Sequence, residues 1–283
     1  MEHHFRYQIT EKDEGKCVGD YLREKGYSRN ILILLKQTAE GILLNHRPVH
    51  TNGELCAGDL LETVLAEPQH RERISAVPCD FQIVYEDEDL LVVNKPADMP
   101  VHPSNGNHEY TLANGLTWYY QEKGIPFTFR CINRLDRDTS GLLIIARHML
   151  SAAILSEDMK KRRILRTYLG ITEGNITHSG TITAPIARKE GSVLERCVDF
   201  ENGEPAVTHY APVYYQEAKN LTLTAFSLET GRTHQIRVHM KWLGHPLIGD
   251  FLYYPPERRN RPAGTSFLET GIFAADHGGK TAV

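Results

Sequence analysis

The sequence has no long hydrophobic run and no closely spaced pair of cysteines. A membrane-spanning helix needs about 20 consecutive apolar residues, and no stretch approaches that length. The N-terminal segment MEHHFRYQIT also lacks the basic and then apolar pattern of a secretion signal. We therefore expect a cytoplasmic protein with no membrane partner. An odd number of scattered cysteines fits reduced thiols better than a disulfide framework; they are Cys17, Cys56, Cys79, Cys131 and Cys197.

The chain also lacks the short motifs of several large enzyme classes. There is no GxGxxG, no P-loop and no GxSxG, which argues against the usual nucleotide-binding and acyl-transfer sites. No CxxC or HExxH spacing is present, so we expect no metal site and interpret the histidines as structural. The histidines considered for a metal are His102, His108, His234, His239 and His245.

The charge balance gives no sign of a nucleic-acid partner. The formal net charge is -4 at pH 7, so the whole molecule has no attraction for polyanions. Any binding to RNA or DNA would depend on local clusters of Lys and Arg.

Residues 1–65 are predicted to form a compact helix, helix, strand module. Residues 18–25 have a helical pattern that ends at Gly26. Ser28 is a suitable N-cap for a second helix over 29–39. Short apolar runs at 42–44 and 60–64 are set off by turn residues and predict strands. The following residues, 66–78, lose periodicity and gain charge and proline, which is typical of a linker.

The remainder, residues 79–283, is predicted to form a second domain rich in strands. Two β-branched runs flank the acidic turn at 86–89 and predict a hairpin. Helices are expected over 111–121 and 150–160, and a buried strand over 142–147. The later runs TYLGIT, TITAPIA, VTHYAPVYY, LTLTAFSLE and THQIRVHMKWLG are interpreted as extended. Many strands without regular strand-helix alternation favour an α+β fold over a doubly wound parallel sheet.

The first candidate for chemistry is Asp136, in the run INRLDRDTSGLLIIAR. This run joins a polar loop to an apolar strand, so its polar side chains should lie at the edge of the core. Arg134 and Arg137 flank Asp136, and nearby cations stabilise an ionised, nucleophilic carboxylate. Alternatively, Asp136 or Asp138 caps the turn at 139–141, and spacing alone leaves these two interpretations level.

The second candidate is Arg237, in the run GRTHQIRVHMKWLGHPLIGD. Strand-like alternation from Thr233 predicts one face with His234, Ile236 and Val238 and another with Gln235, Arg237 and His239. An arginine held by a strand could pair with a carboxylate from another element, because its planar fork suits bidentate contact. A surface arginine is the alternative.

The third candidate is the basic run KKRRILRTYLG, which precedes a strand carrying Tyr168. Cations beside an aromatic ring suit an RNA backbone and an unstacked base. A solvated helix end next to a packed tyrosine is the alternative. The cations are Lys160, Lys161, Arg162, Arg163 and Arg166.

Taken together and in order, NKPADMPVHPS, NRLDRDTSGLLIIAR, RTYLGI and GRTHQIRVHMKWLGHPLIGD closely resemble the RluA/RluD family of RNA pseudouridine synthases. The resemblance covers roughly residues 80–253. The N-terminal module resembles the small S4-like RNA-binding domain of several family members, through SRN, LLN and the GD turn. This implies RNA contacts at Ser28 and Arg29.

The resemblance implies a mixed, mainly antiparallel central sheet with a cleft along it, and no cofactor or metal. By position, it makes Asp136 the essential aspartate, Tyr168 the active-site tyrosine and Arg237 the basic partner of the aspartate. The implied reaction converts uridine to pseudouridine in structured RNA, either by attack of Asp136 on carbon 1′ or through a glycal. A paired uridine would have to be flipped out, with Arg134 and its neighbours filling the gap.

The expected partner is RNA, with large-subunit ribosomal RNA favoured and transfer RNA possible, bound by a monomer. The residues implied in substrate and RNA binding are Arg134, Arg137, Thr139, Lys160, Lys161, Arg162, Arg166, His234, Gln235, Ser28 and Arg29.

Two departures from the family pattern stand out. The tail RPAGTSFLETGIFAADHGGKTAV matches poorly and leaves the final core strand open, and Asn133 stands where many members have His. The tail and the accessory module keep a non-catalytic RNA-binding or ribosome-assembly protein as the alternative. A glycosidase is disfavoured, because Asp136 and Asp138 lie on one loop whereas such enzymes place two carboxyls on opposite sides of a sugar.

Overall fold

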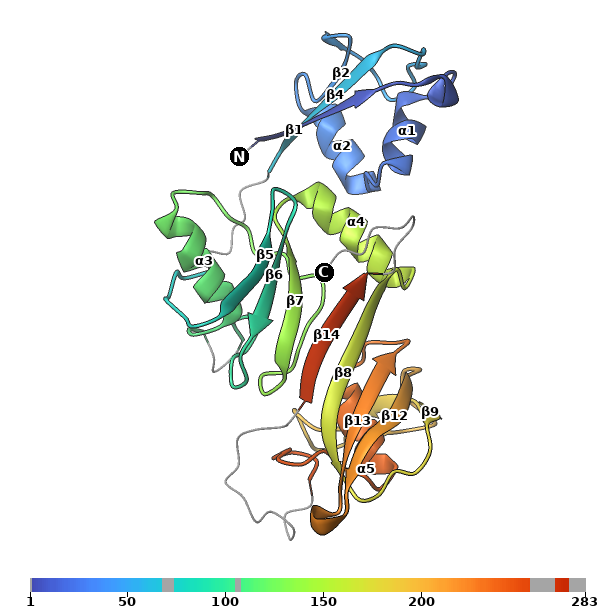
Figure 1. Cartoon of the computed structure of the whole chain (residues 1–283). Coiled ribbons are helices and arrows are strands. Elements are labelled where there is room, and N and C mark those ends of the chain that lie inside the picture. Colours follow the sequence, from blue (N-terminus) through green and yellow to red (C-terminus); the bar gives the residue numbers. More distant parts are fainter. Residues whose placement is uncertain (1, 68–73, 105–107, 255–267, 275–283) are drawn as a thin grey trace.

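The computed structural model describes residues 2–67, 74–104, 108–254 and 268–274. The N-terminal residues form a four-stranded antiparallel sheet in the order β1-β4-β2-β3, with two helices packed on it (Figure 1). Its elements are β1 (Glu2–Gln8), the 3-10 helix η1 (Glu11–Asp13), α1 (Val18–Glu24), α2 (Arg29–Gln37), β2 (Ile42–Leu44), β3 (Arg47–Pro48) and β4 (Leu60–Ala66). The two predicted helices and two predicted strands of this region are confirmed, and the Ser28 side chain caps α2 by accepting from Ile31 N.

The rest of the chain is built on an eight-stranded sheet in the order β5-β6-β7-β14-β8-β13-β12-β9. The strands are β5 (Gln82–Glu86), β6 (Leu90–Lys95), β7 (Ser140–Ala146), β8 (Ile164–Glu173), β9 (Gly180–Thr183), β12 (Val207–Gln216), β13 (Leu221–Leu228) and β14 (Leu268–Ala274). Among the described strands only β7 and β14 run parallel. The predicted α+β fold with a mixed, mainly antiparallel central sheet is therefore confirmed.

Three α-helices, one 3-10 helix and a small hairpin complete this part. They are α3 (Leu112–Glu122), α4 (Met149–Lys160), the hairpin β10 (Ile186–Arg188) and β11 (Arg196–Val198), the 3-10 helix η2 (Glu217–Lys219), and α5 (Gln235–Trp242). Helix α3 starts where Thr111 and Asn114 cap each other reciprocally. Its apolar face, with Leu112, Leu116 and Tyr120, packs in the main core against β6 and β7.

Helix α4 joins the two parts of the molecule. It contacts β7 and β8 of the central sheet, while Leu150 on it is buried in the core of the N-terminal module (Figure 1). Glu67, just after β4, accepts a hydrogen bond from Met149 N at 2.8 Å and forms an ion pair with Arg130. The segment 66–78 that was predicted as a linker thus begins with a residue fixed against α4. Its residues 68–73 lie outside the described residues.

One expectation about the C-terminal third is wrong, and one question that the sequence left open there is answered. The run from Gln235 was expected to be a strand, but it is helix α5, which ends before Gly244 at a positive φ of 88°. Ile236, Val238 and Met240 alternate like a strand, yet the six residues 235–240 are all buried. Alternation is not diagnostic in a segment that is buried on every side.

The question left open concerns the tail. The sequence left the final core strand open, whereas β14 lies in the middle of the central sheet between β7 and β8 (Figure 1). It pairs with seven residues of β8, from Ile164 to Gly170. The rest of the predicted tail, residues 261–267 and 275–283, lies outside the described residues.

Candidate active site

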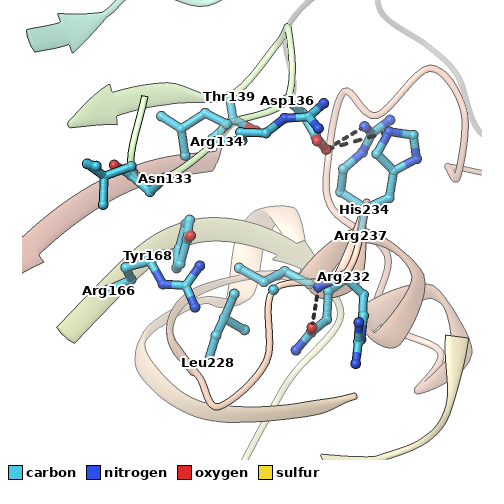
Figure 2. Close-up of a pocket in the computed structure, with 15 residues that line it drawn as sticks. Asn133, Arg134, Asp136, Thr139, Arg166, Tyr168, Leu228, Arg232, His234 and Arg237 are labelled. Carbon is cyan, nitrogen blue, oxygen red and sulfur yellow. Dashed lines mark hydrogen bonds and ion pairs between the residues drawn. The ribbon is translucent and has the colours of Figure 1, made fainter. Parts of the chain in front are cut away.

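A pocket of about 260 Å³ lies where the loop before β7 faces β8 and the segment leading into α5. Figure 2 shows the side chains around it. They come from segments far apart in sequence: 132–139, 166–168, 228 and 231–237. The lining residues are Ile132, Asn133, Arg134, Leu135, Asp136, Thr139, Arg166, Tyr168, Leu228, Gly231, Arg232, His234, Gln235, Ile236 and Arg237.

The Asp136 carboxylate faces the Arg237 guanidinium, as the dashed lines in Figure 2 show. Arg237 Nη1 donates to Asp136 Oδ2 at 2.9 Å, across 101 positions of sequence. The side chain of Asp136 is 28% exposed and that of Arg237 only 5%. A buried arginine thus holds a carboxylate that still reaches solvent through the pocket. The side chain of Asp136 bonds to Arg237, while the backbone carbonyl of Asp136 accepts the turn bond from Thr139 N.

Arg237 remains charged because acidic partners outweigh its burial. Burial alone would lower the pKa of the guanidinium, but the hydrogen bonds and charges of Asp250 and Asp136 raise the pKa above its ordinary value. The expected bidentate contact does exist, but it is made with Asp250 and not with Asp136. Arg237 Nε and Nη2 donate to the two Asp250 oxygens at 2.6 and 3.0 Å.

Two side chains fix the loop that carries Asp136. The ammonium group of Lys95, fully buried at the end of β6, donates to the carbonyls of Pro96, Met99 and Arg137 at 2.7 to 2.9 Å. Burial lowers the pKa of Lys95 to about 8 although Asp138 and Asp136 lie nearby. Asn133 accepts from Ile144 N and donates to Leu142 O, which ties the start of the loop to β7. Its place in the pocket wall is a supporting one.

Tyr168 forms the opposite wall. It is 5% exposed, and it lies on β8 two residues after Arg166, so both side chains point to the same face. Figure 2 shows its ring below the loop from Asn133 to Asp136. Leu228, from the end of β13, extends this apolar wall. The pocket therefore combines an aromatic wall, a carboxylate and several cations, which fits a planar uncharged ring attached to a phosphodiester.

His234 and Gln235 line the pocket as expected but are engaged within the protein. His234 Nδ1 is 2.7 Å from the Tyr253 hydroxyl and its Nε2 is 3.8 Å from Asp136 Oδ2. Burial lowers the pKa of this histidine, so its neutral form is favoured. Gln235 accepts from Thr230 and Arg232 and donates to Val207 O. These bonds hold the turn before α5.

The other predicted binding residues lie partly at the pocket and partly elsewhere in the molecule. Arg134 is exposed at the pocket rim, and Thr139 and Arg166 line the pocket. Arg137 lies outside it and pairs with Asp138. Lys160 and Lys161 approach Glu157 at 3.9 and 3.3 Å, and Arg162 pairs with Glu229 at 3.0 Å. Ser28 and Arg29 lie at the start of α2 in the N-terminal module, on a different part of the molecule.

Several residues of the site were not singled out from the sequence. Lys95, Asp250 and Tyr253 support Asp136 or Arg237, and Leu228 and Arg232 line the pocket. Lys95 and Asp250 did lie within the matched runs NKPADMP and GHPLIGD. A lysine and an aspartate at the ends of apolar runs were the available signal, because charges next to buried strands need partners.

Two more of the histidines considered for a metal have hydrogen-bond partners within the protein. His239 bonds to Thr208 and to the Ala184 carbonyl, and His245 bonds to the Glu173 carbonyl. No group of three or more His, Cys, Asp or Glu in the described part of the chain could hold a metal ion. None of the described helices is long and apolar enough to cross a membrane.

Comparison with known proteins places this pocket in a family. The model of the family described as RNA pseudouridylate synthase matches residues 89–242, which include Asp136, Tyr168 and Arg237. The chain belongs to the RNA pseudouridylate synthase family. Pseudouridine synthases are isomerases that act on RNA. The match begins before β6 and ends at α5, so it spans all of the pocket-lining segments.

Individual relatives of this synthase are similar over most of the chain. The uncharacterized RNA pseudouridine synthase YjbO of Bacillus subtilis is 39% identical over 83% of this chain and 83% of its own length. Ribosomal large subunit pseudouridine synthase D of Haemophilus influenzae is 36% identical over 82% of this chain and 70% of its own. Among solved structures, human RNA pseudouridylate synthase domain containing 1 superposes with a TM-score of 0.59 at 28% identity, covering 73% of this chain and 81% of that chain.

Proposed function

We propose that this synthase converts uridine to pseudouridine in large-subunit ribosomal RNA, with Asp136 as the nucleophile. The observation that carries this proposal is the Asp136 carboxylate, held at 2.9 Å by buried Arg237 and open to a pocket whose far wall is Tyr168. The reaction must detach uracil from ribose, turn it so that carbon 5 faces the sugar, and rejoin the two. A nucleophile is needed to hold or activate the ribose fragment during this rotation.

The three residues have distinct roles in this proposal. Asp136 either attacks carbon 1′ or removes the 2′ proton, and both routes need an ionised carboxylate at the sugar. Arg237 supplies the nearby positive charge and the hydrogen bond that orient this carboxylate toward the ribose. Tyr168 stacks on the uracil ring and serves as the group that accepts the proton from carbon 5.

The surroundings of the pocket support RNA as the substrate. Arg134, Arg166 and Arg232 line or rim the pocket, so a phosphodiester would meet cations on both sides of the bound base. A base in a helix would have to be flipped out to reach Asp136. The preference for large-subunit ribosomal RNA is supported by the relatives named for that activity, such as the enzyme of Haemophilus influenzae.

We further propose that residues 1–65 are an S4-like RNA-binding domain and that 79–283 form the catalytic domain. Exposed Arg29 at the start of α2 supports an RNA contact there, whereas the Ser28 side chain is engaged as a helix cap. The alternative of a non-catalytic RNA-binding protein was based partly on the atypical tail, and β14 removes that reason. A monomeric state and a cytoplasmic location stay predictions.

The test is a map of pseudouridine in total RNA from cells with the gene, from cells without it, and from deletion cells that carry the Asp136→Asn gene instead. We expect one or more ribosomal uridines to lose modification on deletion, and the variant to restore none of them, with a rate at least about 10⁴-fold below wild type. Asp98→Asn is the matched control, because Asp98 is an exposed carboxylate near the same loop and outside the pocket. Full restoration by Asp136→Asn would refute the nucleophile assignment.

A further inference from the structure

Asp250 is a buried carboxylate that does not line the pocket, yet it makes two of the three hydrogen bonds of the Arg237 guanidinium to carboxylates, including the shortest. Its side chain is 0% exposed, and its two oxygens accept from Arg237 Nε and Nη2 at 2.6 and 3.0 Å. Oδ1 also accepts from the backbone N–H groups of Leu252 and Tyr253 at 2.9 and 3.0 Å. Asp250 therefore fixes one whole edge of the guanidinium fork and is itself fixed by the backbone.

The contact with Asp250 determines how Arg237 can meet Asp136. Since Nε and Nη2 are occupied, the guanidinium presents Nη1 to Asp136 and makes one bond, to Oδ2. Within the described residues, no side chain donates a hydrogen bond to Asp136 Oδ1. A guanidinium released from Asp250 could turn its fork and bind both oxygens of Asp136, since bidentate pairing is the favoured geometry of an Arg–carboxylate pair.

Tyr253 restricts the same guanidinium from its face. The Arg237 guanidinium carbon lies 5.0 Å from the centre of the Tyr253 ring, within the range of a cation–π contact. The Tyr253 hydroxyl accepts from Arg196 N at 2.9 Å and lies 2.7 Å from His234 Nδ1. The ring is thus tied through its hydroxyl to the β10–β11 hairpin and to the turn before α5.

We propose that Asp250 is a positioning residue for the isomerisation. It holds Arg237 so that Asp136 receives a single end-on hydrogen bond and keeps its second oxygen for the ribose. The inference rests on the function proposed above. The alternative is that Asp250 only ties the segment 250–253 to α5 and has no influence on the reaction.

The discriminating variant is Asp250→Asn. The Asn carbonyl oxygen can still accept from Leu252 N and Tyr253 N, but the amide that replaces Oδ2 cannot accept from Arg237 Nε. We expect kcat on an RNA shown to be modified by the wild-type enzyme to fall about 100-fold, the usual effect of a small misplacement in an active site. KM should change by less than about threefold, because the loss concerns the transition state and not RNA binding.

Glu67→Gln is the matched control. Glu67 is a largely shielded carboxylate, with its side chain 9% exposed, that also pairs with an arginine and accepts a backbone N–H, but it lies at the contact between the N-terminal module and α4. Urea denaturation measures the stability of both variants. We expect Glu67→Gln to lose stability and keep the wild-type kcat, which would show that instability alone does not lower kcat.

Each outcome decides the proposal. A folded Asp250→Asn enzyme with wild-type kcat overturns it, and so does an equal loss of kcat in Glu67→Gln at equal stability. If Asp250→Asn does not fold, Asp250→Glu keeps the charge and displaces the carboxylate by one methylene; a loss of kcat at constant KM supports the proposal, and a wild-type kcat refutes it. A wild-type enzyme that modifies no RNA would instead refute the proposed function.

Discussion

At the pocket, Arg237 lies between Asp136 and Asp250, whereas at the junction of the N-terminal module and α4, Arg130 pairs with Glu67. Both arginines are shielded, with side chains 5% and 14% exposed. The carboxylates differ. Glu67 is 9% exposed and uses both oxygens, one for Arg130 and one for Met149 N, while Asp136 is 28% exposed and bonds through one oxygen.

The charged groups at the pocket and at the junction are therefore paired to different degrees. The junction contains one arginine and one carboxylate in direct contact, and both are enclosed. The pocket region holds two carboxylates, Asp250 and Asp136, around one arginine, and Asp136 faces the cavity. Buried charges need paired partners for stability, so a carboxylate in excess at a cavity indicates a functional group. The comparison predicts that changes at the pocket alter the reaction and that changes at the junction alter stability alone.

Arg237→Met should have the largest effect, because it changes both the stability of the fold and the rate of the reaction. Asp250 would stay buried without its counter-charge, which costs about 3–5 kcal/mol of unfolding free energy. Loss of the charge beside Asp136 should lower kcat about 10²- to 10³-fold. Chemical denaturation and a pseudouridine assay at saturating RNA measure the two effects.

A double variant separates these effects. Arg237→Met combined with Asp250→Asn removes both buried charges and keeps the acceptor for Leu252 N and Tyr253 N. It should regain most of the stability, as neutral replacements of buried pairs generally do, without regaining activity. Recovery of activity together with stability would mean that Arg237 acts only through the fold.

The sequence predicted which residues line the pocket better than it predicted how these residues are arranged. Local spacing could not join Asp136 to Arg237, which are 101 residues apart, and only the order of matched runs did so. The strand expected around Arg237 is a helix, because six consecutive buried residues fit either periodicity. That error hid Asp250, whose role depends on where a helix places the guanidinium.

The fold class could be predicted from local sequence patterns, whereas the last strand, β14, could not. Hairpins such as β5–β6 are signalled by neighbouring residues, and the four segments 29–37, 82–86, 90–95 and 149–160 lie close to their predicted places. β14 pairs with β7 and β8, which precede it by about a hundred or more residues of sequence, and its segment LETGIFA has polar and glycine residues that weaken a strand pattern. Its position depends on unpaired edges of β7 and β8, which are distant in sequence, so no local sequence pattern predicts it.

Arg130→Met should have an intermediate effect, confined to stability. Glu67 would keep the hydrogen bond from Met149 N but lose its counter-charge, which costs about 1–3 kcal/mol. Because the junction lies away from the pocket, kcat should stay within about twofold of wild type. The measurements are urea denaturation and turnover at saturating RNA. A tenfold loss of kcat at unchanged stability would show that the docking of the N-terminal module governs the pocket.

The smallest effect should come from His3, which extends the junction cluster. Its ring lies 4.8 Å from that of His148, and its Nε2 is buried without a hydrogen-bond partner among the described residues. Burial, followed by the charge of His148, lowers the pKa of His3 from 6.5, against the opposing influence of Glu67. In the unfolded chain His3 is protonated as the pH falls through about 6.5, whereas in the folded chain it stays neutral to lower pH. The free energy of unfolding therefore decreases as the pH falls below that value.

His3→Leu should therefore lose less stability than wild type between pH 7.5 and pH 5.5, in thermal unfolding followed at both values. His4→Leu is the control, because His4 is exposed on the same strand. Wild-type turnover of His3→Leu at pH 7.5 is expected, since the pocket is not involved. An equal acid sensitivity of wild type and His3→Leu would place the acid-sensitive group elsewhere, and the buried His234 at the pocket would then be the next one to test.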